Sequence, residues 1–436
     1  LYWEVPKHFE NVSAIGPGGQ FTGKKYGDYE KESQRFAWKL FEVYKEGDGA
    51  GRPFFFPKPL VHITEKFFRT EGHMDFLNHI ADVSADKGNT YYVFDRGETA
   101  KISECCRLSF KLEKSDLRDA MEPWRMRYCA LQNVSLNLPR IAYTAQHDDT
   151  KLMDLITQRF LLATKAHKEK RAFLEKLLAH GEDGPLALLT MNRDGMPYLR
   201  FDRAAHLIGM VGLNEMVQIH TGEEMHESKQ ALKFGLKIMA HMKLLTDKIQ
   251  RQEGFKIVLE QTPAESTSYR FARLDLHYFS PSSGRVVKGD IASGEVYYTN
   301  STHLNVGYPM NPIERVTNEG IFHPLIEAGS ISHVWLGESH PYKQALADFV
   351  IKTFRHTTND QIAFSPEFTT CNKCHRTSRG LDDICSYCGS SDVDGITRIT
   401  GYFTKVSSWN KGKLGELKDR HRVGEYFNEQ QKVANG

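Results

Sequence analysis

Four cysteines near the end of the chain form two closely spaced pairs. Cys371 and Cys374 are separated by two residues, as are Cys385 and Cys388, and ten residues join the pairs. Two short knuckles can place four thiolates tetrahedrally around one ion, which is the closed coordination that structural zinc prefers. An iron-sulfur cluster uses the same ligand type, and a redox-active pair is a third interpretation. We favour zinc, and its role would be structural, since a closed site has no free position for a reacting water.

Three short motifs follow the cysteines along the chain. They read Arg398-Ile399-Thr400-Gly401-Tyr402, Asn410-Lys411-Gly412-Lys413 and Glu416-Leu417-Lys418-Asp419-Arg420. Alone, the first of these strings is typical of a turn. Together, the three motifs resemble the C-terminal glycyl-radical loop of the anaerobic, class III ribonucleoside-triphosphate reductases. That family carries its zinc where this chain has the four cysteines.

Five earlier segments match the same family in the same order. They are Cys106-Arg107, Asn137-Leu138-Pro139-Arg140-Ile141-Ala142, Thr262-Pro263-Ala264-Glu265 with Tyr269-Arg270, Asn300-Ser301-Thr302-His303-Leu304 and His333-Val334-Trp335-Leu336-Gly337-Glu338. The resemblance therefore covers most of the chain. It implies a ten-stranded α/β barrel of the glycyl-radical type, whose interior receives a cysteine loop and a glycine loop from opposite ends.

The resemblance assigns radical chemistry to two of these loops. A radical on a backbone carbon is delocalised into the flanking amides only if the centre can flatten, and glycine has no side chain to resist this. Gly401 is the candidate. Cys106 is the candidate thiol that gives its hydrogen atom to the glycyl and then attacks a ribose carbon. Tandem cysteines also occur in related formate-lyases, so Cys105 is an alternative to Cys106.

Three further residues are candidates for the site. A buried Glu265 would have a raised pKa and could exchange protons with a hydroxyl, whereas an exposed one would pair with Arg270 or Arg273. Asn137 could bind a ribose hydroxyl or a small carboxylate, or it could pin the end of a strand. Ser301 lies in a family motif and is a candidate substrate-binding residue. We expect His303 and His333 to be structural.

The chain departs from the family at several points. Glu104-Cys105 stands where many members have Met-Gly, and Leu108 where they have serine. Glu104 could replace the part that formate plays in some members, so formate dependence is not carried over. The family also has a second redox cysteine on an early strand and an ATP-binding cone before the barrel, and we identify a counterpart of neither in this sequence. Residues 1–104 contain no cysteine, so either the chain begins before Leu1 or this member does without that cysteine. We expect the natural polypeptide to begin before Leu1, which is not methionine.

Composition excludes other classes of protein. The 436 residues carry 57 lysines and arginines against 55 aspartates and glutamates, a net charge of +2. This balance does not indicate a nucleic-acid surface. The longest apolar stretches, residues 186–191 and 321–326, are far shorter than the ~20 residues of a spanning helix, so we expect no membrane insertion. Seven cysteines, an odd number, are typical of a reduced cytoplasmic chain.

The elements that position these residues follow from periodicity. Helical spacing predicts helices over residues 151–180 and 227–252. Aromatic and β-branched runs predict strands over residues 90–94, 134–141, 256–259, 269–273 and 296–299. We expect a catalytic α/β barrel over residues 1–364, a zinc ribbon over 365–390, and the glycyl-radical loop and tail over 391–436.

The favoured function is anaerobic reduction of ribonucleoside triphosphates to deoxyribonucleoside triphosphates. The resemblance implies a radical-SAM activating enzyme that installs the radical on Gly401, nucleotide effectors and a homodimer. Two alternatives remain. One is a glycyl-radical lyase or dehydratase, although such enzymes usually lack the zinc ribbon. The other is a non-catalytic zinc-ribbon protein that binds nucleic acid, against which the near-neutral charge argues.

Overall fold

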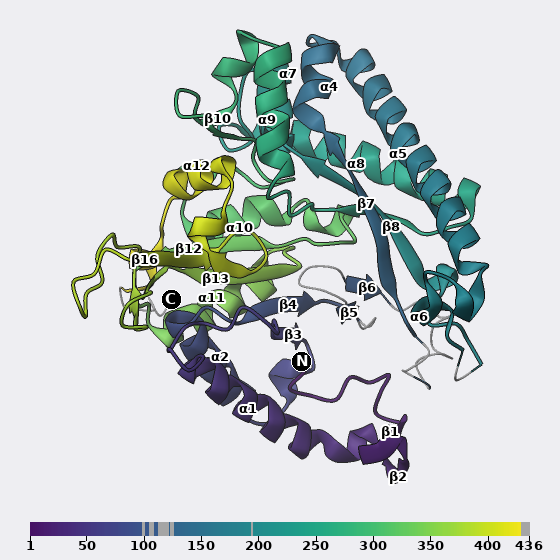
Figure 1. Cartoon of the computed structure of the whole chain (residues 1–436), viewed down its shortest axis with the longest axis vertical. Helices are drawn as coiled ribbons and strands as arrows, with labels where there is room; N and C mark the ends of the chain where they lie inside the picture. Colours follow the sequence, from purple (N-terminus) through teal and green to yellow (C-terminus); the bar gives the residue numbers. More distant parts are fainter. Residues whose placement is uncertain (98–100, 104–108, 112–121, 123–125, 193–194, 429–436) are drawn as a thin grey trace.

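A computed structural model gives the arrangement of the chain. It describes residues 1–97, 101–103, 109–111, 122, 126–192 and 195–428. Helices and strands alternate through these ranges, so the α/β class is confirmed. Two sheets built from distant parts of the chain carry helices on their outer faces, and a smaller antiparallel sheet lies near the C-terminus (Figure 1).

The first sheet joins the beginning of the chain to its last third, in the order β12-β13-β4-β3. Its strands are β3 (Leu60–Thr64), β4 (Tyr91–Asp95), β12 (Ser332–Gly337) and β13 (Gln361–Pro366). The outer pairs are parallel, and the central pair β13–β4 is antiparallel, with Ile362 opposite Tyr92. Helices α1 (Glu30–Glu46), α2 (His73–Asp86) and α11 (Lys343–His356) share one apolar core with this sheet. Strand β4 confirms the strand predicted at residues 90–94.

The second sheet is parallel throughout. Its strands, in sheet order, are β7 (Cys129–Asn137), β8 (Ala204–Val211) and β9 (Ile257–Glu260). Its helices are α4 (Leu138–Ala145), α5 (Asp149–Leu178), α7 (Leu213–Thr221) and α8 (Lys229–Glu253). They pack against the sheet in a second apolar core, because parallel neighbours need crossover connections that cover the sheet. Helices α5 and α8 confirm the two long helices predicted from periodicity (Figure 1).

Two predicted strands are wrong in part or in whole. The strand predicted over residues 134–141 ends at Asn137, where the Asn137 side chain accepts a hydrogen bond from the Arg140 amide and caps helix α4. Pro139 then sits in the first helical turn, which tolerates its missing N–H. Residues 269–273 lie within helix α9 (Thr267–Tyr278), whose buried residues recur at helical spacing. The aromatic residues of this segment had suggested a strand.

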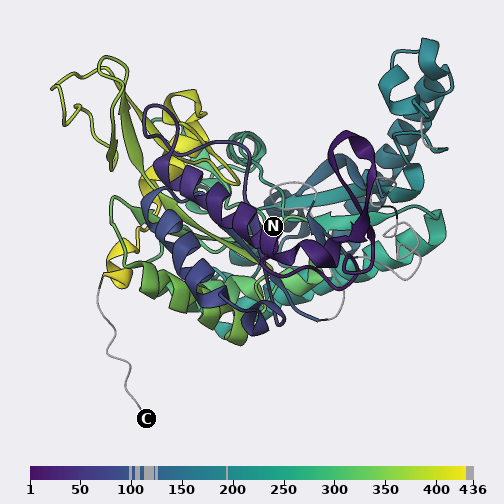
Figure 2. The same ribbon diagram turned by 90° about the horizontal axis from the view of Figure 1, so that it is seen from below.

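A third, antiparallel sheet carries the C-terminal motifs. Its strands, in sheet order, are β15 (Thr377–Arg379), β14 (Phe368–Cys371), β16 (Val393–Arg398) and β17 (Phe403–Lys405). Helix α12 (Lys411–Asp419) follows and lies beside the hairpin of β10 (Lys288–Asp290) and β11 (Glu295–Tyr297). The predicted boundary at residue 390 falls inside this sheet, so the cysteine knuckles and the glycine hairpin share one hydrogen-bonded framework. The knuckles project from the body of the molecule (Figure 2).

The remaining elements are short. They are β1 (Ser13–Ile15), β2 (Phe21–Lys25), β5 (Lys101–Ser103), β6 (Ser109–Lys111), α6 (Ala187–Thr190) and α10 (Pro312–Gly320). Across the described ranges, the first and second sheets are not hydrogen-bonded to each other, so a closed ten-stranded barrel is not observed and stays a prediction. In the same ranges, no helix is long and apolar enough to cross a bilayer.

Candidate functional site

Gly401 lies at the tip of a tight hairpin. Strands β16 and β17 pair until Arg398 faces Phe403, and four residues make the turn. The Ile399 amide donates to the Tyr402 carbonyl across this turn, at 3.1 Å. Gly401 itself is buried. The hairpin therefore places a glycine backbone inside the protein.

Three segments that are distant in the sequence surround this tip. From strand β4, the Tyr91 hydroxyl donates to the Gly401 carbonyl at 2.6 Å. The Thr400 hydroxyl donates to the Pro263 carbonyl after β9, at 3.2 Å. The Asn300 amide after β11 donates to the Thr400 hydroxyl at 3.5 Å. Strand β4 and the segments after β9 and β11 thus surround the hairpin tip.

Arg420 holds the residues that enter the hairpin turn. Its guanidinium donates to the Arg398 carbonyl at 2.9 Å and to the Ile399 carbonyl at 3.0 Å. The same group stacks on the Trp335 ring, 3.9 Å from the centroid. Arg420 is 2% exposed, so these bonds form away from water. It consequently restrains the two residues that lead into the turn.

A buried ion cluster holds Arg420 in place. Glu416 accepts from Arg420 at 2.9 Å and from Lys413 at 2.5 Å, and all three side chains are almost fully buried. Burial alone would raise the pKa of Glu416, but the two cations outweigh it and hold that pKa below its usual range. Burial lowers the pKa of Lys413 and of Arg420. The cluster is therefore held together by one carboxylate between two cations.

Two side chains beside the hairpin offer unsatisfied polar atoms. Ser301 is fully buried with φ 45°, and within the described residues its hydroxyl has no hydrogen-bond partner. The Asn300 carbonyl oxygen is likewise buried without a partner there. Buried polar groups are normally paired, so such atoms are available to a ligand. His303, in the same loop, donates to the Ile331 carbonyl at 2.8 Å, as expected of a structural histidine.

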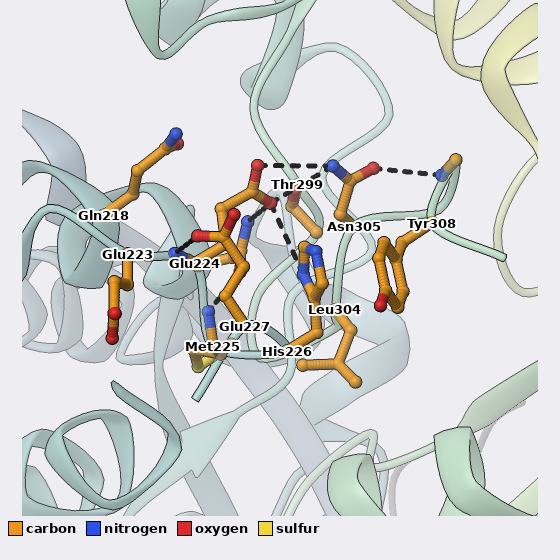
Figure 3. A network of polar contacts seen from close by, with 12 residues as sticks. Gln218, Glu223, Glu224, Met225, His226, Glu227, Thr299, Leu304, Asn305 and Tyr308 are labelled. Atoms are coloured by element: carbon orange, nitrogen blue, oxygen red, sulfur yellow. Dashed lines mark hydrogen bonds and ion pairs between the residues drawn. The ribbon is translucent and has the colours of Figure 1, made fainter. Parts of the chain in front are cut away.

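Two buried carboxylates pin the ends of this loop. Glu215 accepts from both the amide and the hydroxyl of Thr299, and burial raises the pKa of Glu215. At the other end, the Asn305 amide donates to Glu224 at 3.1 Å, and Figure 3 shows it pointing toward that carboxylate. The segment that carries Ser301 is therefore anchored on both sides. Sequence reasoning missed both glutamates, because neither lies in a recognised motif.

Replacing Lys288 by methionine should weaken this anchor. Lys288 donates to Glu224 at 2.6 Å, and both side chains are nearly buried. Burial alone would raise the pKa of Glu224, but Lys288 lowers it overall. We expect the free energy of unfolding at pH 7 to fall by about 2 kcal/mol, the usual worth of a hydrogen bond to a charged group. Chemical denaturation measures this loss.

The pH dependence of that loss provides a check. Because the pKa of Glu224 is depressed in the folded protein, its stabilisation is present above the unfolded pKa of about 4.3 and is lost as the pH falls through the folded value. The deficit of the Lys288→Met variant should therefore shrink in acid. Lys31→Met, which breaks an exposed pair with Glu71, should cost less than ~1 kcal/mol at either pH. Equal effects of the two variants at pH 7 would contradict the anchor.

Asn137 has partners that favour the strand-pinning interpretation. Besides capping helix α4, its amide donates to buried Asp275 at 3.0 Å, which also accepts from Arg140 at 2.7 Å. Asn137 also lines a cavity of about 410 Å³ together with Arg140 and Arg159. Substrate binding by Asn137 stays a prediction.

Glu265 lies close to the hairpin's following helix. It is half-buried, and its backbone carbonyl accepts from the Asn410 amide at 2.9 Å. Among the described residues it forms no ion pair with Arg270 or Arg273. The surface salt bridge is therefore not formed, and the acid–base role stays a prediction. Cys105 and Cys106 lie outside the described residues, so their predicted roles are likewise untested.

The four cysteines gather as the spacing predicts. Their sulfur atoms all lie within 4.8 Å of one another, with Cys371 Sγ 3.7 Å from Cys388 Sγ and Cys374 Sγ 3.6 Å from Cys385 Sγ. A tetrahedron with ~2.3 Å metal–sulfur bonds has edges of about 3.8 Å. The donor set and its dimensions therefore fit a four-coordinate metal ion.

This architecture is that of the anaerobic ribonucleotide reductases. A solved anaerobic ribonucleotide reductase matches 97% of this chain and 63% of its own with a TM-score of 0.74, at 18% identity. The Thermotoga maritima anaerobic ribonucleotide reductase, solved with dATP and CTP, gives a TM-score of 0.72 over 95% of this chain and 64% of that chain, at 17% identity.

Sequence comparison gives the family. The anaerobic ribonucleoside-triphosphate reductases of Salmonella typhimurium and Escherichia coli are each 29% identical over 303 residues, 66% of this chain. The chain spans about two fifths of the length of these relatives, since the match covers 41% of each. The model of the anaerobic ribonucleoside-triphosphate reductase family matches residues 1–422, and the chain belongs to that family.

Proposed function

We propose that this protein reduces ribonucleoside triphosphates to deoxyribonucleoside triphosphates by glycyl-radical chemistry. The observation that carries the proposal is the buried hairpin tip, where the Tyr91 hydroxyl of the first sheet donates to the Gly401 carbonyl and the neighbouring Thr400 hydroxyl donates to the Pro263 carbonyl after β9. Such a tip shields a backbone radical from water and oxygen. Family membership supplies the class of reaction, an oxidoreductase acting on ribonucleoside triphosphates.

The radical path involves two loops of the chain. A radical on the Gly401 α-carbon takes a hydrogen atom from the Cys106 thiol, which restores glycine and leaves a thiyl radical. The thiyl then takes a hydrogen atom from a ribose carbon of the substrate. Cys105 is the alternative thiol. The Ser301 hydroxyl and the Asn300 carbonyl oxygen are buried without a partner among the described residues, and we assign Ser301 to substrate binding. Glu265 and Asn137 are candidates for proton exchange and ribose binding.

The proposal includes cofactors and partners. Zinc in the four-cysteine cluster would hold the knuckles folded. A radical-SAM activating enzyme would install the radical on Gly401. Nucleotide effectors are proposed by analogy with the Thermotoga maritima relative, which was solved with dATP and CTP. We also propose a homodimer and a closed ten-stranded barrel.

Substituting Gly401 by alanine tests the function. Anaerobic activation of the wild-type protein should give a glycyl doublet in electron paramagnetic resonance and turnover of ribonucleoside triphosphates. Gly401→Ala should abolish both, since alanine's methyl group opposes a flat radical centre. Gly49→Ala is the matched control, because an added Cβ there meets nothing within 4 Å.

Three outcomes would contradict the proposal. A doublet that persists in Gly401→Ala would remove the radical from this residue. A doublet without nucleotide turnover, but with turnover of small diols or carboxylates, would favour a lyase or dehydratase. Salt-dependent oligonucleotide binding with no radical would favour a zinc-ribbon binding protein.

A further inference from the structure

Tyr91 links the hairpin that carries Gly401 to the first sheet. The side chain is 2% exposed, and its hydroxyl lies 2.6 Å from the Gly401 carbonyl oxygen, 310 residues later in the chain. Successive residues of a strand face opposite sides of the sheet. Tyr92 accordingly points the other way and bonds the Ser84 hydroxyl of helix α2 at 2.8 Å. Within one strand, Tyr91 therefore contacts the hairpin and Tyr92 contacts the helical layer.

Arg398 sets the direction of the Tyr91 hydrogen bond. Its guanidinium lies 4.3 Å from the centre of the Tyr91 ring, and Nη1 approaches the Tyr91 hydroxyl at 3.4 Å. A guanidinium has only donors, so Arg398 must donate to the phenol oxygen. A carbonyl only accepts, so the phenol hydrogen points to Gly401. The donor and acceptor roles follow from the chemistry of these three groups.

The Tyr91 hydroxyl bonds the carbonyl oxygen of Gly401, and the unpaired electron of a glycyl radical is delocalised onto that carbonyl. An unpaired electron on the Gly401 α-carbon is shared with the adjoining carbonyl group only while that group stays coplanar with the radical centre. A donor on the carbonyl oxygen stabilises the form with electron density there. In a buried site such a bond is stronger than in water. The Tyr91 hydroxyl can therefore hold the Gly401 carbonyl coplanar with the radical centre and also polarise it.

We propose that Tyr91 is a positioning residue for the radical, holding and polarising the Gly401 carbonyl through its hydroxyl. The proposal rests on the proposed function, because it needs a glycyl radical at Gly401. No bond of Tyr91 is made or broken; the phenol remains a hydrogen-bond donor throughout. Arg398, stacked on the ring, keeps the donor aimed at the carbonyl.

The test measures the radical rather than the turnover. Protein labelled with [1-¹³C]glycine is activated anaerobically, and the ¹³C hyperfine coupling of the radical reports spin density on the Gly401 carbonyl carbon. Tyr91→Phe should change this coupling and shorten the half-life of the radical roughly five- to tenfold, the effect of losing about one hydrogen bond. Tyr92→Phe is the matched control. It loses a buried hydroxyl from the same strand, but that hydroxyl bonds Ser84 of helix α2 on the opposite side of the strand, so coupling and half-life should not change.

Each outcome decides a separate question. No doublet in the activated wild-type protein would overturn the proposed function itself. A wild-type doublet with the same coupling and half-life in Tyr91→Phe would overturn the role of Tyr91 and leave the function intact. If Tyr91→Phe does not fold, protein made with 3-fluorotyrosine decides. The more acidic phenol should shift the coupling in the sense opposite to loss of the bond, and an unchanged coupling would overturn the proposal.

Discussion

Replacing Cys385 by serine should prevent metal binding by the four-cysteine cluster and disrupt the sheet that presents Gly401. Cys385 and Cys371 are almost fully buried, and strand β14 ends at Cys371, paired with Val393 of β16. Binding of a structural zinc supplies about 10–16 kcal/mol of folding free energy in small zinc modules. Its loss should therefore free the knuckles and then the β14–β16 pair that leads to the hairpin.

The metal content and the radical are measured on the same samples. We expect one zinc per chain in the wild-type protein by mass spectrometry of the metal, and none in Cys385→Ser, with a lower thermal midpoint and little or no glycyl doublet. Cys129→Ser is the control, since Cys129 begins strand β7 far along the chain from the cluster. Iron in place of zinc would correct the identity of the metal. A metal-free protein with a full doublet would show that the hairpin does not depend on the knuckles.

The parts of the fold that sequence predicts best are those with a strong local period. Helix α5 repeats buried residues at helical spacing, including Leu152, Ile156 and Phe160. Helix α9 was misread because its aromatic residues favour strands, while its buried Ser268, Ala272 and Asp275 are only partly apolar. A polar residue can be buried when a partner satisfies it, and local hydrophobicity does not reveal that partner.

In the candidate site, too, local features could be predicted from the sequence and long-range contacts could not. The four cysteines and Gly401 could be proposed from the sequence because their spacing and motifs are local. The contacts that hold Gly401 are not local: Tyr91 comes from the other end of the chain, and its strand reads only as a buried aromatic run. Glu416 and Arg420 were quoted only as motif residues. Their spacing of four residues on a helix could have indicated an ion pair, but not that the pair would be buried.

Glu416→Gln should destabilise the protein by about 3–5 kcal/mol, because it leaves two buried cations without their carboxylate. The side chains of Lys413 and Arg420 are fully buried, and Glu416 is their common partner. Glutamine keeps the shape and one acceptor but no charge. Chemical denaturation at pH 7 gives the free energy. The doublet of the activated variant should also decay faster, because Arg420 would no longer be fixed against the Arg398 and Ile399 carbonyls.

Charge rather than packing is responsible for this effect if pH changes it. The pKa of Glu416 is depressed in the folded protein, so its stabilisation is present above about pH 4.3 and is lost as the pH falls through the folded value. The deficit of Glu416→Gln should narrow over that window. Glu169→Gln, in an exposed pair with Lys165, should cost under ~1 kcal/mol at every pH. A Glu416→Gln deficit that stays constant in acid would mean that packing, and not the ion cluster, holds Arg420 against the hairpin.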